Sequence, residues 1–199
     1  MTLPLSWQGQ RQAGVLLHPT CLPGGGDLGP AARDFVDFLA VSGFRVWQML
    51  PVGPVHADGS PYLSQSSFAG NTGLISPDDI IRLGLLPDCI DPENLKSPER
   101  RELLTQVHGT LPDHPEHQDA LALFCEANGD WLDDYALFRC LARHHGNRPW
   151  PRWPTAESNR DPERLATLHA DLAPEIELEC LGQYLFALQW QALPDYAAD

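Results

Sequence analysis

The most constraining feature of this 199-residue sequence is a pair of short apolar runs separated by a helical pattern. The runs cover residues 13–18 and 44–52, and both are rich in strand-forming side chains. Between them, apolar residues recur at helical spacing, at positions 31, 32, 35, 36, 38 and 39. Gly43 then stands where a helix commonly ends. The segment therefore predicts a βαβ unit with parallel strands and a right-handed crossover.

Beyond this unit the pattern is almost entirely helical. Apolar periodicity predicts helices at residues 77–86, 98–109, 120–129, 130–146 and 163–199. Pro174 is expected to split the last of these, because proline lacks the N–H that a helix interior needs. The segments between the helices are expected to be a polar connector at residues 110–119 and a proline- and tryptophan-rich loop at residues 147–162.

Two strands and a handful of helices are fewer elements than a complete (β/α)8 barrel contains, since that fold needs eight strands in roughly 250 residues. We therefore expect an α/β fold: the opening part of a (β/α)8 TIM barrel, with about two strands, and a mostly helical insertion subdomain. The expected divisions are 11–75 for the start of the barrel, 76–160 for the insertion, and 161–199 for a long helix leading back toward the barrel. We expect a fragment that stops before a third strand.

The charge balance excludes several classes of partner. Acidic side chains outnumber basic ones by 27 to 13, which gives a formal charge of −14 at pH 7. This excess repels phosphate backbones and anionic lipids, so neither a nucleic acid nor a membrane is expected as a partner. The sequence has no run of roughly 18 apolar residues and no signal-peptide pattern. Its five cysteines form no CxxC pair, which indicates a reduced, cytoplasmic protein.

Most side chains that could carry chemistry have a structural explanation. His108, His114 and His117 lack a metal-binding pairing such as HExxH, so we expect surface loop histidines and no metal or cofactor. Carboxylates near predicted helix starts suit the helix dipole; they are Asp27, Asp34, Asp78, Asp79, Asp130, Asp133 and Asp134. Four tryptophans could be sugar platforms: Trp131, Trp150, Trp153 and Trp190. Trp131 and Trp190, together with Trp47, are expected to be packing residues.

An uncharged segment follows the second apolar run, from Gly59 to Pro77. Its neutral donors and acceptors suit a polyhydroxylated ligand, and Tyr62 offers a flat apolar face for a sugar ring. In parallel α/β folds, moreover, functional loops follow the carboxyl ends of the strands. The alternative is a serine-rich turn that satisfies its own backbone, with Tyr62 in the core. The polar residues concerned are Ser60, Ser64, Gln65, Ser66, Ser67 and Asn71.

Five segments, in order along the chain, resemble the N-terminal part of the 4-α-glucanotransferases of the amylomaltase (disproportionating enzyme) family. They read RQAGVLLHPTCLPGGGDLG, FVDFLAVSGFRVWQMLPVGP, GSPYLSQSSFAGNTGLIS, GDWLDDYALFRCLARHHGNRPWPRWP and FALQW. The resemblance runs from about residue 11 to about residue 196, practically the whole chain. It implies a (β/α)8 barrel with helical insertions, as expected above.

The resemblance also implies an activity: a retaining transfer of α-1,4-glucan segments to a sugar 4-hydroxyl in maltooligosaccharide and glycogen metabolism. Such a reaction needs two carboxyls about 5 Å apart, one as nucleophile and one as acid and base. The family carries them on later strands, so no catalytic residue is expected in this chain. The family's Ser-Pro-Tyr loop matches Ser60 and Tyr62, which are the expected substrate-binding residues.

Two departures from the family pattern are visible. The stretch CLPGGGDLG is shorter than its family counterpart and lacks an aromatic residue, and HADG replaces a segment in which some members carry a tyrosine that holds glucan at a secondary groove. Two alternatives to an enzyme stay open: a non-catalytic module that binds maltooligosaccharides, and an inactive fragment. We expect the 199-residue chain alone to lack transferase activity.

Overall fold

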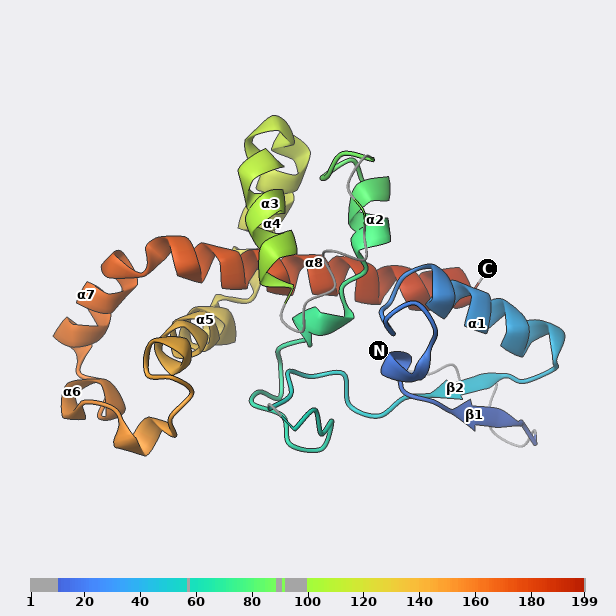
Figure 1. The fold of residues 1–199 in the computed structure, drawn as a ribbon, viewed down its shortest axis with the longest axis horizontal. Coiled ribbons are helices and arrows are strands. Elements are labelled where there is room, and N and C mark those ends of the chain that lie inside the picture. Colours follow the sequence, from blue (N-terminus) through green and yellow to red (C-terminus); the bar gives the residue numbers. More distant parts are fainter. Residues whose placement is uncertain (1–10, 57, 89–90, 92–99, 199) are drawn as a thin grey trace.

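The computed structural model describes residues 11–56, 58–88, 91 and 100–198. It contains the predicted βαβ unit: β1 (Gly14–Leu16), α1 (Pro30–Val41) and β2 (Val46–Gln48). The two strands are parallel, as predicted, with Val15 opposite Trp47 (Figure 1). Helix α1 begins with a proline at its first position, which suits a helix start, and Gly43 adopts φ +78° just after its end.

The strands are shorter than the apolar runs that predicted them. Backbone hydrogen bonds between them extend only from Arg45 N and Ala13 O to Leu17 N and Gln48 O. Beyond that point Pro19 begins the 3-10 turn η2 (Pro19–Cys21), which turns the first chain away from the second. Within the described residues β2 pairs only with β1, so its other edge has no strand beside it.

The rest of the described chain is helical, as predicted. Its α-helices are α2 (Pro77–Arg82), α3 (Arg101–Thr110), α4 (Pro115–Ala127), α5 (Gly129–His144), α6 (Thr155–Ser158), α7 (Pro162–Asp171) and α8 (Ala173–Ala198). Its other 3-10 turns are η3 (Thr72–Leu74), η5 (Leu111–Asp113) and η6 (Trp150–Arg152). The expected break near Pro174 is confirmed, since α7 ends at Asp171 and α8 begins at Ala173. No helix in the described part is both long and apolar enough to span a membrane.

The prediction of a polar connector at residues 110–119 is wrong. The segment between α3 and α4 consists of η5 and His114, and α4 starts at Pro115, five residues earlier than expected. The polar residues of this stretch, including Glu116 and Gln118, form the exposed side of the first turns of α4. The loop predicted at residues 147–162 likewise contains η6 and α6. Helix α2 ends at Arg82, sooner than predicted, because Gly84 leaves the helical conformation with φ +77°. The predicted start of the next helix, residue 98, lies outside the described residues.

Helix α8 is the central element of the fold. It runs along the length of the molecule in Figure 1 and packs against α1, α3, α4, α5 and α7. All residues from Glu179 to Phe186 are buried, so this part of the helix is covered on every side. Leu181 and Leu185 are completely buried in the largest hydrophobic cluster.

Two glutamines of α8 clamp a segment that is distant in sequence. The amide of Gln183 accepts a hydrogen bond from Gly70 N (2.8 Å) and donates one to Gly70 O (3.1 Å). Gln189 does the same with Ser76 N (2.7 Å) and Ser76 O (3.0 Å). Both glutamines are buried. These amides therefore satisfy four backbone groups of the 70–76 segment that the interior would otherwise leave unpaired.

Close backbone approach explains a glycine in this segment. A Cβ atom on Gly70 would overlap the ring of Phe186 on α8. Glycine lets the backbone come near enough for Gln183 to reach both of its polar groups.

Ion pairs hold the surrounding elements to this core. Glu179 of α8 faces three arginines, with Arg143 at 2.6 Å, Arg101 at 3.5 Å and Arg139 at 4.0 Å. These arginines come from α3 and α5, so the single carboxylate joins three helices. A buried charge is tolerated only with such partners.

A second buried ion pair ties the start of α1 to the helical part. The guanidinium of Arg100 lies 3.7 Å from Asp27, which also accepts a hydrogen bond from Gly29 N (3.0 Å). Arg100 donates another bond to Ile75 O (2.9 Å). Asp27 is thus a structural residue beside the helix start, as its position in the sequence predicted.

Replacing Gln183 by methionine should destabilise the fold by about 2–4 kcal/mol, because two buried backbone groups of Gly70 lose their partners while the volume is nearly kept. Urea unfolding measures this loss. Gln191→Met on the exposed side of the same helix is the matched control, with an expected change of less than about 0.5 kcal/mol. Equal effects of the two substitutions would contradict the clamp.

Gly70→Ala should cost about 1–3 kcal/mol, since the added methyl overlaps Phe186 and must displace backbone or ring. Gly109→Ala, in α3, is the control: a Cβ there meets no atom within 4 Å. It should stabilise the protein by about 0.5–1 kcal/mol through helix propensity. Thermal unfolding of the two variants should therefore shift in opposite directions.

Candidate functional site

The uncharged loop leaves β2 and forms a short projecting hairpin (Figure 1). Val55 and Ser64 form an antiparallel bridge at its base, and Gln65 N donates to Pro54 O (3.2 Å). Gly59 adopts φ +71° in the turn, where glycine is favoured. The chain then returns to the core at Gly70. The loop therefore follows the carboxyl end of a parallel strand, as the sequence predicted.

Both expected substrate-binding residues lie near the tip of this hairpin. Ser60 N donates to Asp58 Oδ1 (3.1 Å), and Ser60 O accepts from Leu63 N (3.3 Å). These bonds fix the backbone and leave the Ser60 hydroxyl without a partner in the described part of the chain. Tyr62 is 73% exposed, so the alternative that it is a core residue is wrong. An exposed ring of this size presents a flat apolar surface to solvent.

Other polar residues of the loop serve the loop itself. Ser64 Oγ donates to Ser66 O (2.7 Å), and Ser66 Oγ accepts from the backbone N–H groups of Phe68 and Ala69 (3.1 Å each). Asn71 Oδ1 accepts from Gly73 N (2.9 Å) at the start of η3. For these three residues, the alternative that polar side chains of this segment satisfy its own backbone is therefore confirmed. Their hydrogen bonds hold the loop in one conformation.

The base of the hairpin is anchored to α5. Gln65 contacts His56 Nδ1 through its amide nitrogen (3.2 Å) and accepts a hydrogen bond from Arg139 (2.5 Å). Phe68 stacks on Trp131 with ring centroids 6.1 Å apart. Because Arg139 also faces Glu179, the base of the hairpin is connected to α8 through the side chains of Gln65, Arg139 and Glu179. No pattern in the sequence indicates this pairing, which joins residues 74 positions apart.

The acidic residues considered in the sequence are mostly engaged in structure. Asp79 forms a bidentate pair with Arg33 (2.7 Å for each bond), and Asp134 pairs with Arg160 (2.6 Å). The first turns of α2 and α5 contain Asp78 and Asp130. Asp34 is on the exposed side of α1.

Two of the three histidines do not lie in a loop, contrary to expectation. His108 belongs to α3, His114 precedes α4, and His117 lies within α4 and contacts the hydroxyl of Tyr184 (2.9 Å). The prediction failed because the connector in which they were placed is largely helical. In the described ranges, no three His, Cys, Asp or Glu side chains gather closely enough to hold a metal ion.

The tryptophans expected to be packing residues are so, and the two left open as sugar platforms differ in exposure. Trp47 is a packing residue as predicted: its indole donates to Leu17 O (2.8 Å) and its ring meets Phe35 edge-on. Trp131 and Trp190 are partly buried against hydrophobic clusters, as expected. Trp153 is only 8% exposed and packs in a cluster, so it is no sugar platform. Trp150 is 55% exposed and keeps that possibility.

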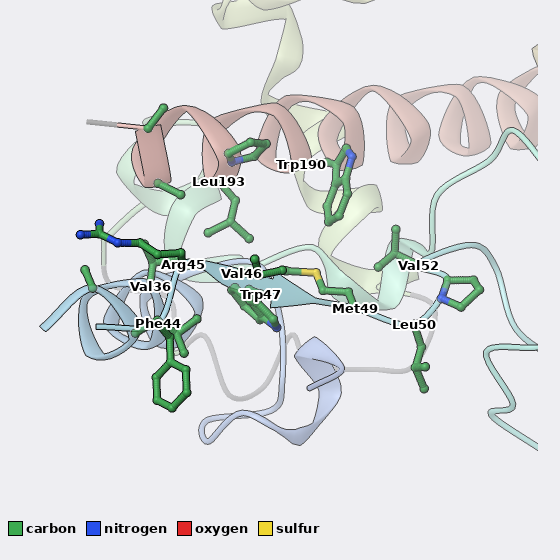
Figure 2. A pocket seen from close by; sticks show the side chains of 16 residues that line it. Val36, Phe44, Arg45, Val46, Trp47, Met49, Leu50, Val52, Trp190 and Leu193 are labelled. Carbon is green, nitrogen blue, oxygen red and sulfur yellow. The ribbon is translucent and has the colours of Figure 1, made fainter. Parts of the chain in front are cut away.

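A large apolar cleft lies along the open edge of β2. It measures about 860 Å³ and is walled by α1, β2 with its following segment, and the end of α8. Figure 2 shows Trp190 and Leu193 of α8 facing Val46 and Met49. Among the described residues on its walls, Arg45 alone is charged. This lining offers few hydrogen bonds to a sugar and resembles a hydrophobic core that lacks one side.

His18 is a polar residue at the carboxyl end of β1 that the sequence did not single out. Its Nδ1 lies 2.7 Å from Thr20 Oγ1 and accepts from Thr20 N, so the ring caps η2. Burial lowers its pKa below 6.5, and the nearby carbonyl of Pro51 opposes this shift without cancelling it. The ring connects the ends of the two strands.

The chain is similar to proteins named 4-alpha-glucanotransferase. A family model described as 4-alpha-glucanotransferase matches residues 17–199. The 4-alpha-glucanotransferase of Thermus thermophilus is 40% identical over 197 residues, covering 92% of this chain and 39% of that protein. That of Synechocystis is 36% identical over 204 residues, covering 94% of this chain and 40% of the relative. The chain thus spans about two fifths of the length of these relatives.

A solved structure agrees with the sequence matches. It is that of an amylomaltase from Streptococcus agalactiae in complex with acarbose, with a TM-score of 0.87 and 32% identity. The similarity covers 96% of this chain and 41% of that one. The mostly helical fold with two parallel strands therefore matches part of an amylomaltase.

Acidification should destabilise this protein partly through His18. Since its pKa is lowered in the folded state, the unfolded state binds the proton more readily below about pH 6.5. The destabilisation due to His18 is absent well above that pH and grows as the pH falls through it. His18→Asn, which keeps an acceptor for the turn, should reduce the loss of unfolding free energy between pH 7 and pH 5. Urea unfolding at several pH values measures it, and parallel curves for both proteins would contradict the assignment.

Proposed function

This chain belongs to the 4-alpha-glucanotransferase family, and on that premise we propose that it is part of an enzyme that transfers α-1,4-glucan segments to a sugar 4-hydroxyl with retention. The observation that carries the proposal is the exposed Ser60–Tyr62 hairpin at the carboxyl end of β2, within a match that runs over residues 17–199. In this proposal the hairpin forms one side of the glucan-binding site.

The proposal extends to the fold. The parallel strands and α1 are the opening of a (β/α)8 barrel, with divisions at residues 11–75, 76–160 and 161–199. The open edge of β2 and the apolar cleft beside it support this reading, because a further parallel strand would cover both (Figure 2). The similar amylomaltase has further chain that could supply that strand, since this chain matches 41% of it.

The substrates in this proposal are α-1,4-glucans and maltooligosaccharides. The similar amylomaltase structure is a complex with acarbose, which supports a saccharide ligand. The C–H face of a sugar ring would stack on Tyr62, while the hydroxyl of Ser60 would meet a sugar hydroxyl. The charge of −14 supports a neutral ligand over a nucleic acid, and a cytoplasmic location stays part of the proposal.

The chemistry would follow the retaining route. One carboxylate attacks the anomeric carbon and displaces the glycosidic oxygen of the departing glucan segment, which a second carboxyl about 5 Å away protonates. The second carboxyl, now a carboxylate, then deprotonates the acceptor hydroxyl, whose oxygen attacks the same carbon and releases the first carboxylate. The described acids considered above are paired with arginines, lie in first turns of helices or are exposed to solvent. We therefore assign both catalytic carboxyls to the part of the family's domain that this chain does not cover.

A second candidate function is glucan binding without chemistry. The engagement of the described acids in structural contacts favours it for the 199-residue chain taken alone. Incubation of the chain with maltotriose separates the two, since released glucose together with longer oligomers would reveal a transferase. We expect neither product from this chain alone.

The test of the loop is binding of maltoheptaose by calorimetry. Tyr62→Ala should weaken binding about tenfold, or about 1.4 kcal/mol, because the stacking face is lost. Tyr62→Phe keeps the face and should change affinity much less. Tyr196→Ala removes a tyrosine at the far end of α8, which bonds Asp37, and should leave affinity unchanged. Equal affinity of wild type and Tyr62→Ala would remove the case for this loop.

A further inference from the structure

Arg139 of α5 lies between two acceptors, one on the hairpin that follows β2 and one on α8. Its guanidinium donates to Gln65 Oε1 at 2.5 Å, and its Nε lies 4.0 Å from Glu179 Oε2. The side chain of Arg139 is only 12% exposed. A buried guanidinium needs polar partners, and the contact distances show which of these two acceptors depends on it.

Glu179 does not depend on Arg139 for a counter-charge. Arg143 lies 2.6 Å from the Glu179 carboxylate and Arg101 lies 3.5 Å from it. The separation of 4.0 Å from Arg139 is at the limit of a direct ion pair. The hydrogen bond to Gln65 is much shorter. A role in the core alone therefore does not account for the position of this guanidinium.

Arg139 fixes the orientation of the Gln65 amide. A guanidinium has donors and no acceptor, so the amide must turn its oxygen toward Arg139. The amide nitrogen then faces the other arm of the hairpin, where it lies 3.2 Å from His56 Nδ1. Because this nitrogen only donates, Nδ1 must accept, and the proton of a neutral His56 ring is on Nε2. The three side chains form a hydrogen-bond chain that runs in one direction, from Arg139 through Gln65 to His56.

The Gln65 residue joins the two arms of the hairpin. Its backbone N–H donates to Pro54 O at 3.2 Å, and its side-chain amide adds the bond to His56. The carbonyl of His56 accepts a hydrogen bond from Gly59 N at 2.9 Å, in the turn at the tip. The residue that Gln65 holds is therefore the one from which the tip extends.

The tip of the hairpin projects into solvent. Tyr62 is 73% exposed, so packing does little to hold it. The clamp of Gln183 on Gly70 holds the returning end of the loop, beyond the hairpin. A displacement of about 1 Å in a binding group markedly weakens what a site can do. An attachment at the base of the hairpin therefore affects binding at the tip.

We propose that Arg139 is a positioning residue for the Ser60–Tyr62 tip. It does not touch the substrate. It orients the amide of Gln65, which holds His56 and hence the tip. The benefit to glucan binding rests on the proposed function, whereas the hydrogen-bond chain and the order of the tip do not.

The first test needs no ligand and uses NMR of the ¹⁵N-labelled 199-residue chain. Backbone order parameters of Gly59 and Leu63 measure how firmly the tip is held. Arg139→Met keeps the aliphatic stem and removes the donors, so the Gln65 amide is free to turn. The order parameters should fall from about 0.85, typical of rigid backbone, toward about 0.6, typical of flexible backbone. Unchanged values in Arg139→Met would overturn the proposal.

The imidazole ¹⁵N shifts of His56 give an independent signature of the hydrogen-bond chain. In mildly alkaline buffer a histidine ring is neutral, and these shifts report which ring nitrogen carries the proton. His56→Asn identifies the His56 signals by their loss. The wild type should show the Nε2–H form alone, and Arg139→Met should add the Nδ1–H form. A mixture of both forms already in the wild type would overturn the assigned direction of the chain.

Arg101→Met is the matched control. It removes another guanidinium that faces Glu179 but takes no donor from Gln65. It should leave the order parameters of the tip unchanged. Equal loosening of the tip in Arg101→Met and Arg139→Met would show a general weakening around Glu179 and would overturn the role of Arg139 through Gln65.

A double-mutant cycle with Gln65→Leu tests whether Arg139 acts through Gln65. Either substitution breaks the same hydrogen-bond chain, so the double variant should loosen the tip no further than each single variant does. Additive loosening would overturn the proposal. If Arg139→Met does not fold, Gln65→Leu breaks the chain from the hairpin side and should loosen the tip alone. Arg139→Lys, which retains a donor, should keep the tip close to its wild-type order.

Calorimetry with maltoheptaose measures the consequence for binding. Arg139→Met should weaken binding about threefold to tenfold, because a loosened loop must be ordered when the ligand binds. Arg139→Lys should recover most of this loss, and Arg101→Met should bind as the wild type does. A looser tip with unchanged affinity would overturn the claim that this positioning benefits the substrate. If the wild type binds no maltoheptaose, the proposed function fails for this chain, and the order of the tip in the variants still decides the role of Arg139.

Discussion

The fold depends on how α8 satisfies polar groups inside the core. Buried amides are tolerated only when every donor and acceptor finds a partner, and Gln183 and Gln189 each meet a complete peptide group. Together they fix the segment from Gly70 to Ser76 against the helix. Glu179, one turn earlier, draws α3 and α5 to the same helix through arginines. Helix α8 therefore holds the C-terminal end of the loop that follows β2.

The helical part of the chain holds the loop that follows the short sheet. The hairpin with Ser60 and Tyr62 leaves β2 at one end and enters the α8 clamp at the other. Arg139 of α5 adds a third attachment through Gln65. A loop held at three points by different elements keeps its tip in place without burying it, which is what a binding loop requires.

Sequence patterns predicted the elements that depend mainly on residues close together in the chain. The βαβ unit followed from apolar runs and Gly43, and the break before α8 followed from Pro174. The connector at residues 110–119 was wrong because a polar helix face and a loop have the same composition. For the site, the sequence indicated Ser60 and Tyr62 and kept Trp150 open. The Gln65–Arg139 and Gln183–Gly70 contacts could not be predicted, because they join side chains far apart in sequence.

The cleft beside β2 places two conflicting requirements on the side chains that line it. Val46 and Leu50 face an apolar hollow, so their hydrophobicity adds little to the stability of the described part. A hydrophilic replacement there would make the isolated chain more soluble and would reduce its tendency to self-associate through an unpaired strand edge. The same replacement would damage any assembly that fills the hollow. Solubility of this chain and burial of the hollow in an assembly therefore place opposite demands on the same residues.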